Sequence, residues 1–250
     1  MIIWASTLIS VAIVSLISLV GVFFLLLKGE KLKNIQLILV GFATGGLLGG
    51  AFFHLLPESF ESYSNLQEVS LLLVAGFMLF FILERFLHWH HNHTSGISEN
   101  VVKPFGTLNL LADGFHNLLD GLLIGAAYTH SHAVGITTTI VVLMHELPQE
   151  IGDFGVLIHA GFSRSKALIF NFLSACTAFL GALIVLIFTG VGEFLSAAVL
   201  PFAAGGFIYL AAADLIPELH AEKALKKSFH QFLALLLGIA LMYLLTFFTE

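Results

Sequence analysis

The sequence predicts an all-α integral membrane protein. We expect eight transmembrane helices in a 3+2+3 inverted repeat, with both termini extracytoplasmic. Three observations predict this fold. The chain of 250 residues is 58% hydrophobic and only 10% charged, whereas soluble domains are about a quarter charged. It contains eight long apolar runs, and its basic residues collect at alternate connections between them.

Each apolar run is long enough to cross a bilayer as a helix, which takes about 20 residues. The runs are continuously apolar instead of alternating, and this excludes the strands of a membrane β-barrel. They extend over residues 4–27, 35–56, 69–87, 105–128, 133–159, 167–189, 194–216 and 229–248.

The connections between the runs differ in charge. All 10 Lys and Arg residues lie in or beside the odd-numbered connections, whereas the even-numbered ones carry acids such as Glu58, Glu61, Glu68 and Glu193. Because Lys and Arg are retained in cytoplasmic loops, both ends of the chain are expected outside the cytoplasm, with the protein in the cell membrane. Charge that is sorted in this way forms no basic patch, so nucleic acid is not an expected partner.

Two further features limit the function classes. The first apolar run is too long for a cleaved signal peptide and lacks a basic N-terminal region. Cys176 is the single cysteine, which excludes an intrachain disulfide and a thiolate metal cluster.

The second and seventh apolar runs share a pattern. At a constant offset of 160 residues, the matches are Gly45-Gly46 with Gly205-Gly206, His54 with Asp214, and Leu55-Leu56-Pro57-Glu58 with Leu215-Ile216-Pro217-Glu218. Gly-Gly pairs and prolines also occur in packed membrane helices without any repeat, but one fixed offset favours an inverted repeat. The expected organisation is a single transmembrane domain, with a first repeat at 1–87, a His-rich connection at 88–103, central helices at 104–160 and a second repeat at 161–250.

Ionisable side chains concentrate in the fourth and fifth runs, where their burial in a bilayer costs several kcal/mol. Helical spacing places Asp113, His116, Asn117 and Asp120 on one face of the fourth run. In the fifth run, His145, Gln149 and Asp153 form one stripe, and Glu146 and Glu150 form a second stripe beside it.

These two clusters lie near the middle of their runs, so adjacent helices would bring them to the same depth. Imidazole nitrogen combined with carboxylate and amide oxygen suits zinc and similar divalent metals. Interhelical hydrogen bonding without metal is the alternative for each residue taken singly. Pro148 cannot donate to the carbonyl of Met144, so we expect a kink that frees a backbone oxygen beside His145.

Other polar residues are assigned to a pathway. Asp113, Asp153 and His159 are expected to line an exit route toward the cytoplasm. For His54 with Glu58, and for Asp214 with Glu218, entrance or exit roles and caps at helix interfaces remain equally open. The third connection carries His88, His90, His91 and His93, which predicts a metal-collecting segment, with a polar linker as the alternative.

The residues His116-Asn117-Leu-Leu-Asp120-Gly121 and His145-Glu146-Leu-Pro148-Gln149-Glu150-Ile-Gly152-Asp153 resemble the paired motifs HNxxDG and HExPHExGD of the ZIP (Zrt/Irt-like) metal transporters. The resemblance implies that His116, Asp120, His145 and the position of Gln149 surround a primary metal. It also implies that Asn117 and Glu146 hold a neighbouring metal with shared carboxylates, and that the chain forms a homodimer. Gln149 stands where the motif has His, and an amide is a weaker and harder ligand than imidazole.

The sequence therefore predicts a transporter in the lipid bilayer that moves divalent cations into the cytoplasm. Zinc is the first candidate, with iron, manganese and cadmium after it, and the metal is cargo instead of a cofactor. The alternative is an intramembrane zinc-dependent hydrolase, because His145-Glu146 begins like an HExxH motif. Gln149 occupies the place of the second His in that motif and argues against it.

Overall fold

The computed structural model describes residues 2–25, 29–62, 65–94, 102–188 and 191–247. These residues form eight helical rods. The first four are α1 (Ile2–Ile17) with η1 (Ser18–Gly21) and α2 (Val22–Leu25), α3 (Gly29–Gly50) with η2 (Ala51–Leu55) and α4 (Leu56–Ser62), α5 (Leu66–Thr94), and α6 (Pro104–His130). The other four are α7 (His132–His159), α8 (Arg164–Ala175) with α9 (Thr177–Ile187), α10 (Val191–Tyr209) with η3 (Leu210–Leu215) and α11 (Ile216–His220), and α12 (Leu225–Thr246).

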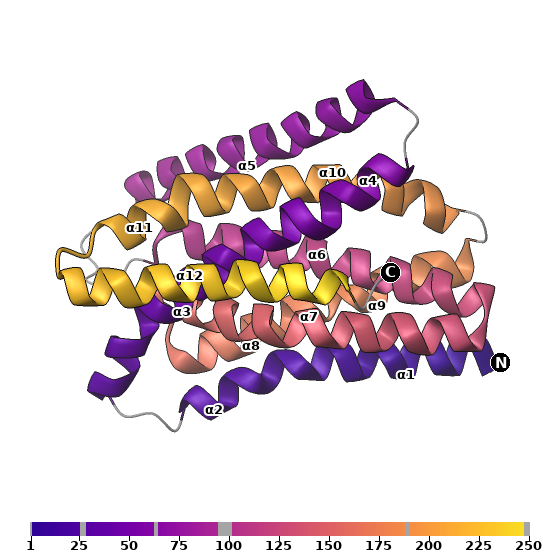
Figure 1. Ribbon diagram of the computed structural model, residues 1–250, viewed down its shortest axis with the longest axis horizontal. Coiled ribbons are helices and arrows are strands. Elements are labelled where there is room, and N and C mark those ends of the chain that lie inside the picture. The colour runs from indigo at the N-terminus through magenta and orange to yellow at the C-terminus, as the bar shows by residue number, and fades with distance from the viewer. Residues whose placement is uncertain (1, 26–28, 63–64, 95–101, 189–190, 248–250) are drawn as a thin grey trace.

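Six of the rods are long and apolar enough to cross a membrane by length and composition. The two that are not among these six are α6 and α7, which hold the conspicuous acids Asp113, Asp120, Glu146, Glu150 and Asp153. Figure 1 shows that α6 and α7 run alongside the other rods. The all-helical fold with eight helices is thus confirmed, and the two helices outside the apolar set of six are those with the predicted site.

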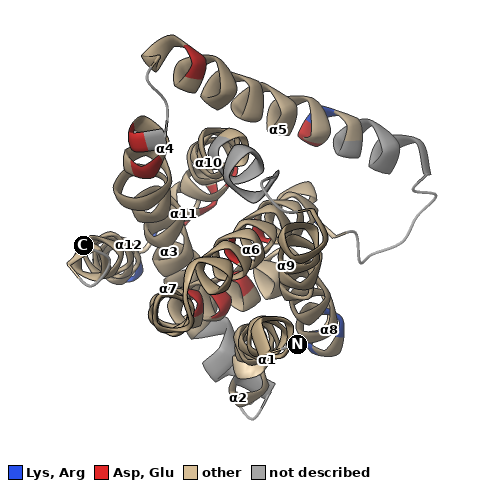
Figure 2. Ribbon diagram, turned by 90° about the vertical axis from the view of Figure 1, so that its right-hand side faces the viewer, with Lys and Arg blue, Asp and Glu red and all other residues tan. Residues whose placement is uncertain are grey.

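The rods alternate in direction, so the bundle has two ends (Figure 1). We call the end that holds the N-terminus and α4 the terminal end, and the end that holds α2 and α11 the basic end. Figure 2 looks onto the terminal end, where α4 and the start of α5 contain acidic residues, coloured red. Lys103, Arg164 and Lys223 lie at the basic end, just before α6, at the start of α8 and just after α11.

The helices pack in two groups. The central group comprises α6 and α7 together with α1, α8 and α9. The flanking group comprises two pairs, α3 with α12 and α10 with α5. The two groups meet where α7 packs on α3 and α6 packs on α10. In the view along the bundle, α6 lies inside and α7 lies beside it between α12 and α1, whereas α5 lies at the edge against α10 (Figure 2).

The two pairs of the flanking group are held together by equivalent glycine contacts. A methyl group added to Gly45 would overlap the carbonyl oxygen of Leu235, and one added to Gly205 would overlap that of Leu73. The reverse contacts also match: Gly238 packs on the carbonyl of Phe42, and Gly76 packs on that of Phe202. Because α3 and α10 run in opposite directions (Figure 1), these equivalent contacts are those expected of an inverted repeat.

Each repeat also contains a π-helical turn in the same place. The turns η2 (Ala51–Leu55) and η3 (Leu210–Leu215) both end two residues before a proline, Pro57 or Pro217. Proline lacks an N–H and its ring crowds the preceding turn, and a π turn accommodates this without breaking the helix. Such turns often occur at functional sites, and these two hold His54 and Asp214.

Two predicted boundaries differ from the structure. Helix α5 continues to Thr94 instead of ending near residue 87, because the segment through His93 contains neither Gly nor Pro. His88, His90, His91 and His93 therefore lie on the last turns of α5, although their side chains are outside the described part of the structure. The sixth rod changes from α8 to α9 at Cys176, whereas the sequence predicts one helix there.

Candidate metal centre

Helices α6 and α7 position the polar residues that the sequence predicts at the centre. Asp113, His116, Asn117 and Asp120 are all buried on α6. Helix α7 begins at an N-cap, Ser131, whose side chain accepts a hydrogen bond from the Val134 N–H at 3.2 Å and satisfies one donor of the first turn. Glu146, Glu150 and Asp153 are buried on α7, and His145 and Gln149 are partly buried.

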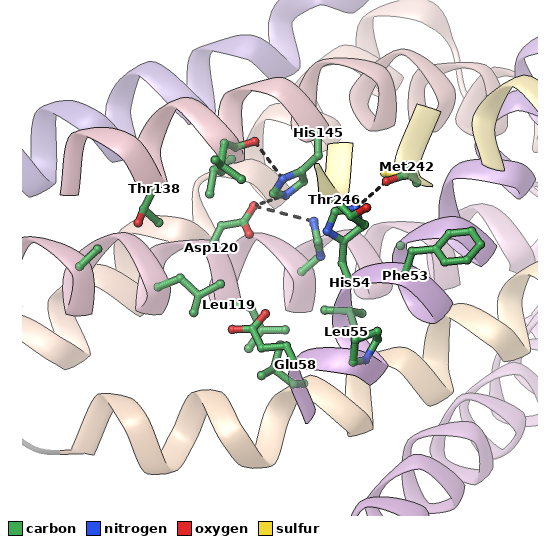
Figure 3. Close-up of a pocket in the computed structure, with 18 of the residues that line it drawn as sticks. Phe53, His54, Leu55, Glu58, Leu119, Asp120, Thr138, His145, Met242 and Thr246 are labelled. Atoms are coloured by element: carbon green, nitrogen blue, oxygen red, sulfur yellow. Dashed lines mark hydrogen bonds and ion pairs between the residues drawn. The ribbon is translucent and has the colours of Figure 1, made fainter. Parts of the chain in front are cut away.

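Four of these side chains converge on one point. His116, Asp120, His145 and Glu146 each offer a ligand atom, and the four atoms lie within 4.8 Å of one another. The Nε2 atom of His116 is 3.1 Å from Glu146 Oε1 and 3.8 Å from Asp120 Oδ2. The Nε2 atom of His145 is 3.6 Å from Asp120 Oδ2 and 3.9 Å from Glu146 Oε1. Figure 3 shows the contact between His145 and Asp120.

These separations match the size of a zinc ion. Zinc binds nitrogen and oxygen ligands at about 2.0–2.2 Å in a tetrahedron, which places the ligands roughly 3.3–3.6 Å from one another. The observed distances of 3.1 to 3.9 Å bracket that range. The four side chains could therefore surround such a cation with little movement.

The same four atoms are without hydrogen-bond partners in the described part of the chain. They are His116 Nε2, Asp120 Oδ2, His145 Nε2 and Glu146 Oε1, and each is shielded from solvent. A buried polar atom without a partner costs about 1–3 kcal/mol, so four of them at one point would be strongly unfavourable unless something binds there. A divalent cation satisfies all four at once.

The orientation of His145 is set by a backbone contact. Its Nδ1 lies 3.2 Å from the carbonyl oxygen of Val141, and a carbonyl only accepts, so Nδ1 carries the proton and Nε2 presents a lone pair to the centre. A second partner that fixes the tautomer is typical of metal-binding histidines. The ring of His116 packs against the ring of Phe207, with centroids 5.3 Å apart.

A second cluster adjoins the first and contains only oxygen ligands. Asp113, Glu146 and Glu150 offer carboxylate oxygens within 4.8 Å of one another. Asn117 Nδ2 donates to Asp113 Oδ1 at 2.8 Å, and Asn171 Nδ2 on α8 donates to Glu150 Oε2. Glu150 and Asn117, which the sequence places with the metal residues, thus lie in this oxygen cluster and not in the four-atom centre.

Asn109 is a polar residue of this region that the sequence analysis missed. Its Nδ2 donates to Asp153 Oδ1 at 3.0 Å, and both residues are buried. Asn109 precedes Asp113 by four residues, so the helical stripe through Asp113 and His116 continues one turn farther toward the basic end. Extending that stripe along the sequence would have found it.

A large cavity leads to the four-atom centre from the terminal end. Its volume is about 700 Å³, and its lining includes Glu61, Glu58 and His54, followed by Asp120 and His145. His54 donates from Nε2 to the Met242 carbonyl at 2.9 Å, and its ring lies 6.2 Å from that of His145. Figure 3 shows His54, Glu58 and Asp120 around this space. His54 and Glu58 therefore both line the cavity, where an entrance role would require them to be.

The other side of the centre is nearly closed. A cavity of only about 10 Å³ lies there, lined by Ala43, Leu47, Asn109, Asp113, Gln149, Asp153 and Phe207. Gln149 lines both cavities, so it stands between the open and the closed side. Asp113 and Asp153 lie on the closed side, where the sequence predicts the exit route.

The remaining pathway candidates lie nearer the basic end. His159 Nε2 is 2.8 Å from Glu218 Oε2, and both side chains are partly exposed. Asp214 lies on η3 and lines neither of the two cavities, although its Oδ2 is buried without a hydrogen-bond partner in the described chain. Asp214 is thus not brought together with the centre, unlike its repeat counterpart His54.

Comparison with known proteins identifies the family. A family model described as ZIP zinc transporter matches residues 1–106 and 95–246. The zinc transporter ZIP13 of Pongo abelii is 37% identical over 228 residues, covering 85% of this chain and 67% of that protein. The zinc transporter ZIP13 of Homo sapiens is 32% identical over 263 residues, covering 85% and 71%. The zinc transporter SLC39A7 of Mus musculus is 29% identical over 299 residues, covering 85% and 63%.

These matches extend over both repeats and the central helices, so they concern the whole bundle and not a local motif. They agree with the resemblance seen in the paired motifs of α6 and α7, and they disfavour the hydrolase alternative. The chain is a multi-pass membrane protein that belongs to the ZIP family of zinc transporters.

Proposed function

We propose that this protein carries zinc across the membrane through the four-atom centre formed by His116, Asp120, His145 and Glu146. The observation that carries the proposal is the convergence of four buried, unpartnered ligand atoms at distances suited to one divalent cation. Two imidazole nitrogens and two carboxylate oxygens favour zinc over magnesium or calcium, which prefer oxygen alone.

The open cavity suggests how metal enters. Glu61, Glu58 and His54 line it, and negative charge at a cleft raises the local concentration of cations. The centre closes on its other side at the small cavity beside Phe207 and Leu47. Metal would leave past Asp113 and Asp153 when that side opens and the first side closes, as in alternating access.

The charge of the connections supports an orientation in the membrane and, with it, a direction of transport. Lys103, Arg164 and Lys223 lie at the basic end, and the positive-inside rule assigns that end to the cytoplasm. The proposal is therefore uptake into the cytoplasm across the cell membrane. Gln149 beside the centre broadens the proposed cargo to iron and manganese, because its amide oxygen is a weaker and harder ligand than imidazole.

A homodimer is part of the proposal. Helix α5 is the least buried of the six apolar helices, and Leu71, Val74 and Met78 are exposed on it. That face is available to a second copy or to lipid. Crosslinking of single cysteines placed along α5 in native membranes would distinguish the two.

The proposed transport is tested by zinc uptake into sealed liposomes that contain the purified protein. His145→Ala removes one ligand and leaves three buried atoms without a partner, so we expect uptake to fall at least about tenfold. Asp120→Asn keeps the shape of the side chain and removes its charge, and the same loss is expected. The matched control is His230→Ala, because His230 is an exposed histidine on α12 whose contacts in the described chain, with Lys226 and Phe229, lie within its own helix.

Uptake at the wild-type rate in both His145→Ala and Asp120→Asn would exclude this centre as the transport site. Uptake that falls equally in His230→Ala would indicate a loss of folded protein instead. Gel filtration of each variant in detergent separates these outcomes, since a misfolded variant elutes in the void volume.

A further inference from the structure

A cluster of charges outside the metal centre joins the two helix groups at the basic end. Lys103, just before α6, places Nζ 2.8 and 2.7 Å from the two carboxylate oxygens of Glu218 on α11. His159, the last residue of α7, places Nε2 2.8 Å from Oε2 of the same carboxylate. One carboxylate of the flanking group therefore holds two nitrogen donors of the central group.

The two donors are held in place by other contacts. The backbone N–H of Lys103 donates to the carbonyl of Ala160, just after α7, at 2.8 Å. Its Nζ lies 5.4 Å from the centre of the Phe105 ring, which stacks on the His159 ring at 5.9 Å. An isolated exposed ion pair contributes little, but this carboxylate accepts several charge-assisted bonds from groups that are already ordered.

The repeat counterpart of Glu218 has different surroundings. Glu58 occupies the equivalent position on α4 and lines the open cavity at the terminal end. Within the described chain, no ion pair is recorded for Glu58. The carboxylate at the open end thus faces the cavity, whereas its counterpart at the closed end is bound to the opposite helix group.

An inverted repeat explains this difference. In such proteins the two halves exchange their arrangements when access moves from one side to the other. In the state that is open at the basic end, Glu218 would take the place that Glu58 has now and would line a cavity. It can do so only after it separates from Lys103 and His159, because these two belong to the group on the other side of the route.

We propose that Lys103, His159 and Glu218 form a latch that holds the basic end of the pathway closed and must release before metal can leave there. The latch spans the exit side of the centre, beyond the small cavity at Leu47 and Phe207. This inference goes beyond the metal centre itself. It rests on the proposed function only in giving the latch a role, because opening of the basic end can be measured without any metal transport.

The test uses two cysteine reporters in a Cys176→Ala background. Leu47→Cys reports opening on the closed side, because Leu47 is 7% exposed and lines the small cavity. Thr138→Cys reports the open cavity, which Thr138 lines (Figure 3). A charged, water-soluble thiol reagent is added to each purified protein, and the rate of labelling is followed by mass spectrometry.

We expect Lys103→Met and Glu218→Gln to raise the labelling rate of the Leu47→Cys reporter about fivefold. The rate follows the equilibrium between the closed and open states of the basic end, and loss of one partly buried ion pair shifts that equilibrium by about this factor. The Thr138→Cys reporter should be labelled more slowly in the same variants, because opening of one side closes the other. Lys103→Arg keeps the charged donors and should leave both reporters unchanged.

Lys227→Met is the matched control. It removes the ion pair of Lys227, at the start of α12, with Glu222 in the connection just before it, 3.7 Å apart; this pair is at the same end of the bundle but lies within the flanking group. Both reporters should behave as in the parent protein. Unchanged labelling of Leu47→Cys in Lys103→Met and Glu218→Gln would overturn the latch, and so would a rise at both reporters together, which indicates general loosening.

Discussion

Two adjacent glycines on α3 allow the packing of the flanking group to be tested by one methyl group. Gly45 lies against the backbone of α12, so a Cβ there would overlap the carbonyl oxygen of Leu235. At Gly46, the nearest atom to an added Cβ is the Met242 methyl at 3.9 Å, an ordinary contact. Gly45→Ala and Gly46→Ala are therefore the same change on the same helix, with opposite steric consequences.

The expected sizes of the two effects follow from these distances. Backbone atoms cannot move aside as a side chain can, so Gly45→Ala must push α3 and α12 apart, and overpacking of this kind costs about 1–3 kcal/mol. Alanine is favoured over glycine inside a helix by about 0.5–1 kcal/mol, which offsets part of the cost. Gly45→Ala should thus destabilise the protein by about 1–2 kcal/mol, whereas Gly46→Ala should stabilise it slightly.

Thermal melting in detergent, followed by circular dichroism, measures both variants. For a chain of this size, 1 kcal/mol corresponds to roughly 2–4 °C in melting temperature, so Gly45→Ala should melt several degrees below Gly46→Ala. Gly205→Ala should repeat the loss, because its Cβ would overlap the carbonyl of Leu73. Equal melting temperatures for Gly45→Ala and Gly46→Ala would refute the close packing of α3 on α12.

Three further predictions concern the site and its orientation. Gln149→His supplies a third imidazole beside the centre and should raise the preference for zinc over manganese about tenfold, as measured by competition uptake in liposomes. Zinc at 100 times its dissociation constant should stabilise the parent protein by about 2.7 kcal/mol, with a matching rise in melting temperature that Asp120→Asn abolishes. A cysteine at Lys223 should react with an impermeant thiol reagent only from the cytoplasmic side in intact cells, and one at Ser131 only from outside; the reverse pattern would invert the proposed direction.

Most of the fold could be predicted from the sequence because membrane helices are defined locally. Apolar length gives each span, and alternating charge gives its direction, without knowledge of any tertiary contact. The site could be predicted for the same reason, since the spacing of His116 and Asp120 places both on one face of α6. The convergence with His145 needed only that α6 and α7 be neighbours, which the short connection at Ser131 ensures.

Other features depend on contacts that no local pattern contains. Lys103 and Glu218 are 115 residues apart, so their pairing depends on how the two helix groups dock. The π turns at His54 and Asp214 cannot be predicted from Pro57 and Pro217 alone, because a proline in a helix is compatible with a kink as well as with a π turn. The assignment of Glu150 to the oxygen cluster depends on Asn171 of α8, which approaches from a helix whose rotation the sequence does not specify.

The reciprocal glycine contacts have a consequence for biogenesis. Each repeat packs its second helix on the third helix of the other repeat, as Gly45 on Leu235 and Gly205 on Leu73 show, so neither half can bury its own glycine stripe. During synthesis, α3 remains exposed to lipid until α12, which is made long after it, has been inserted. A nascent chain stopped before α12 would therefore expose the glycine face of α3, which has no helix to pack on, to quality-control proteases. Truncated chains of this kind should be degraded instead of accumulating as a partly folded protein.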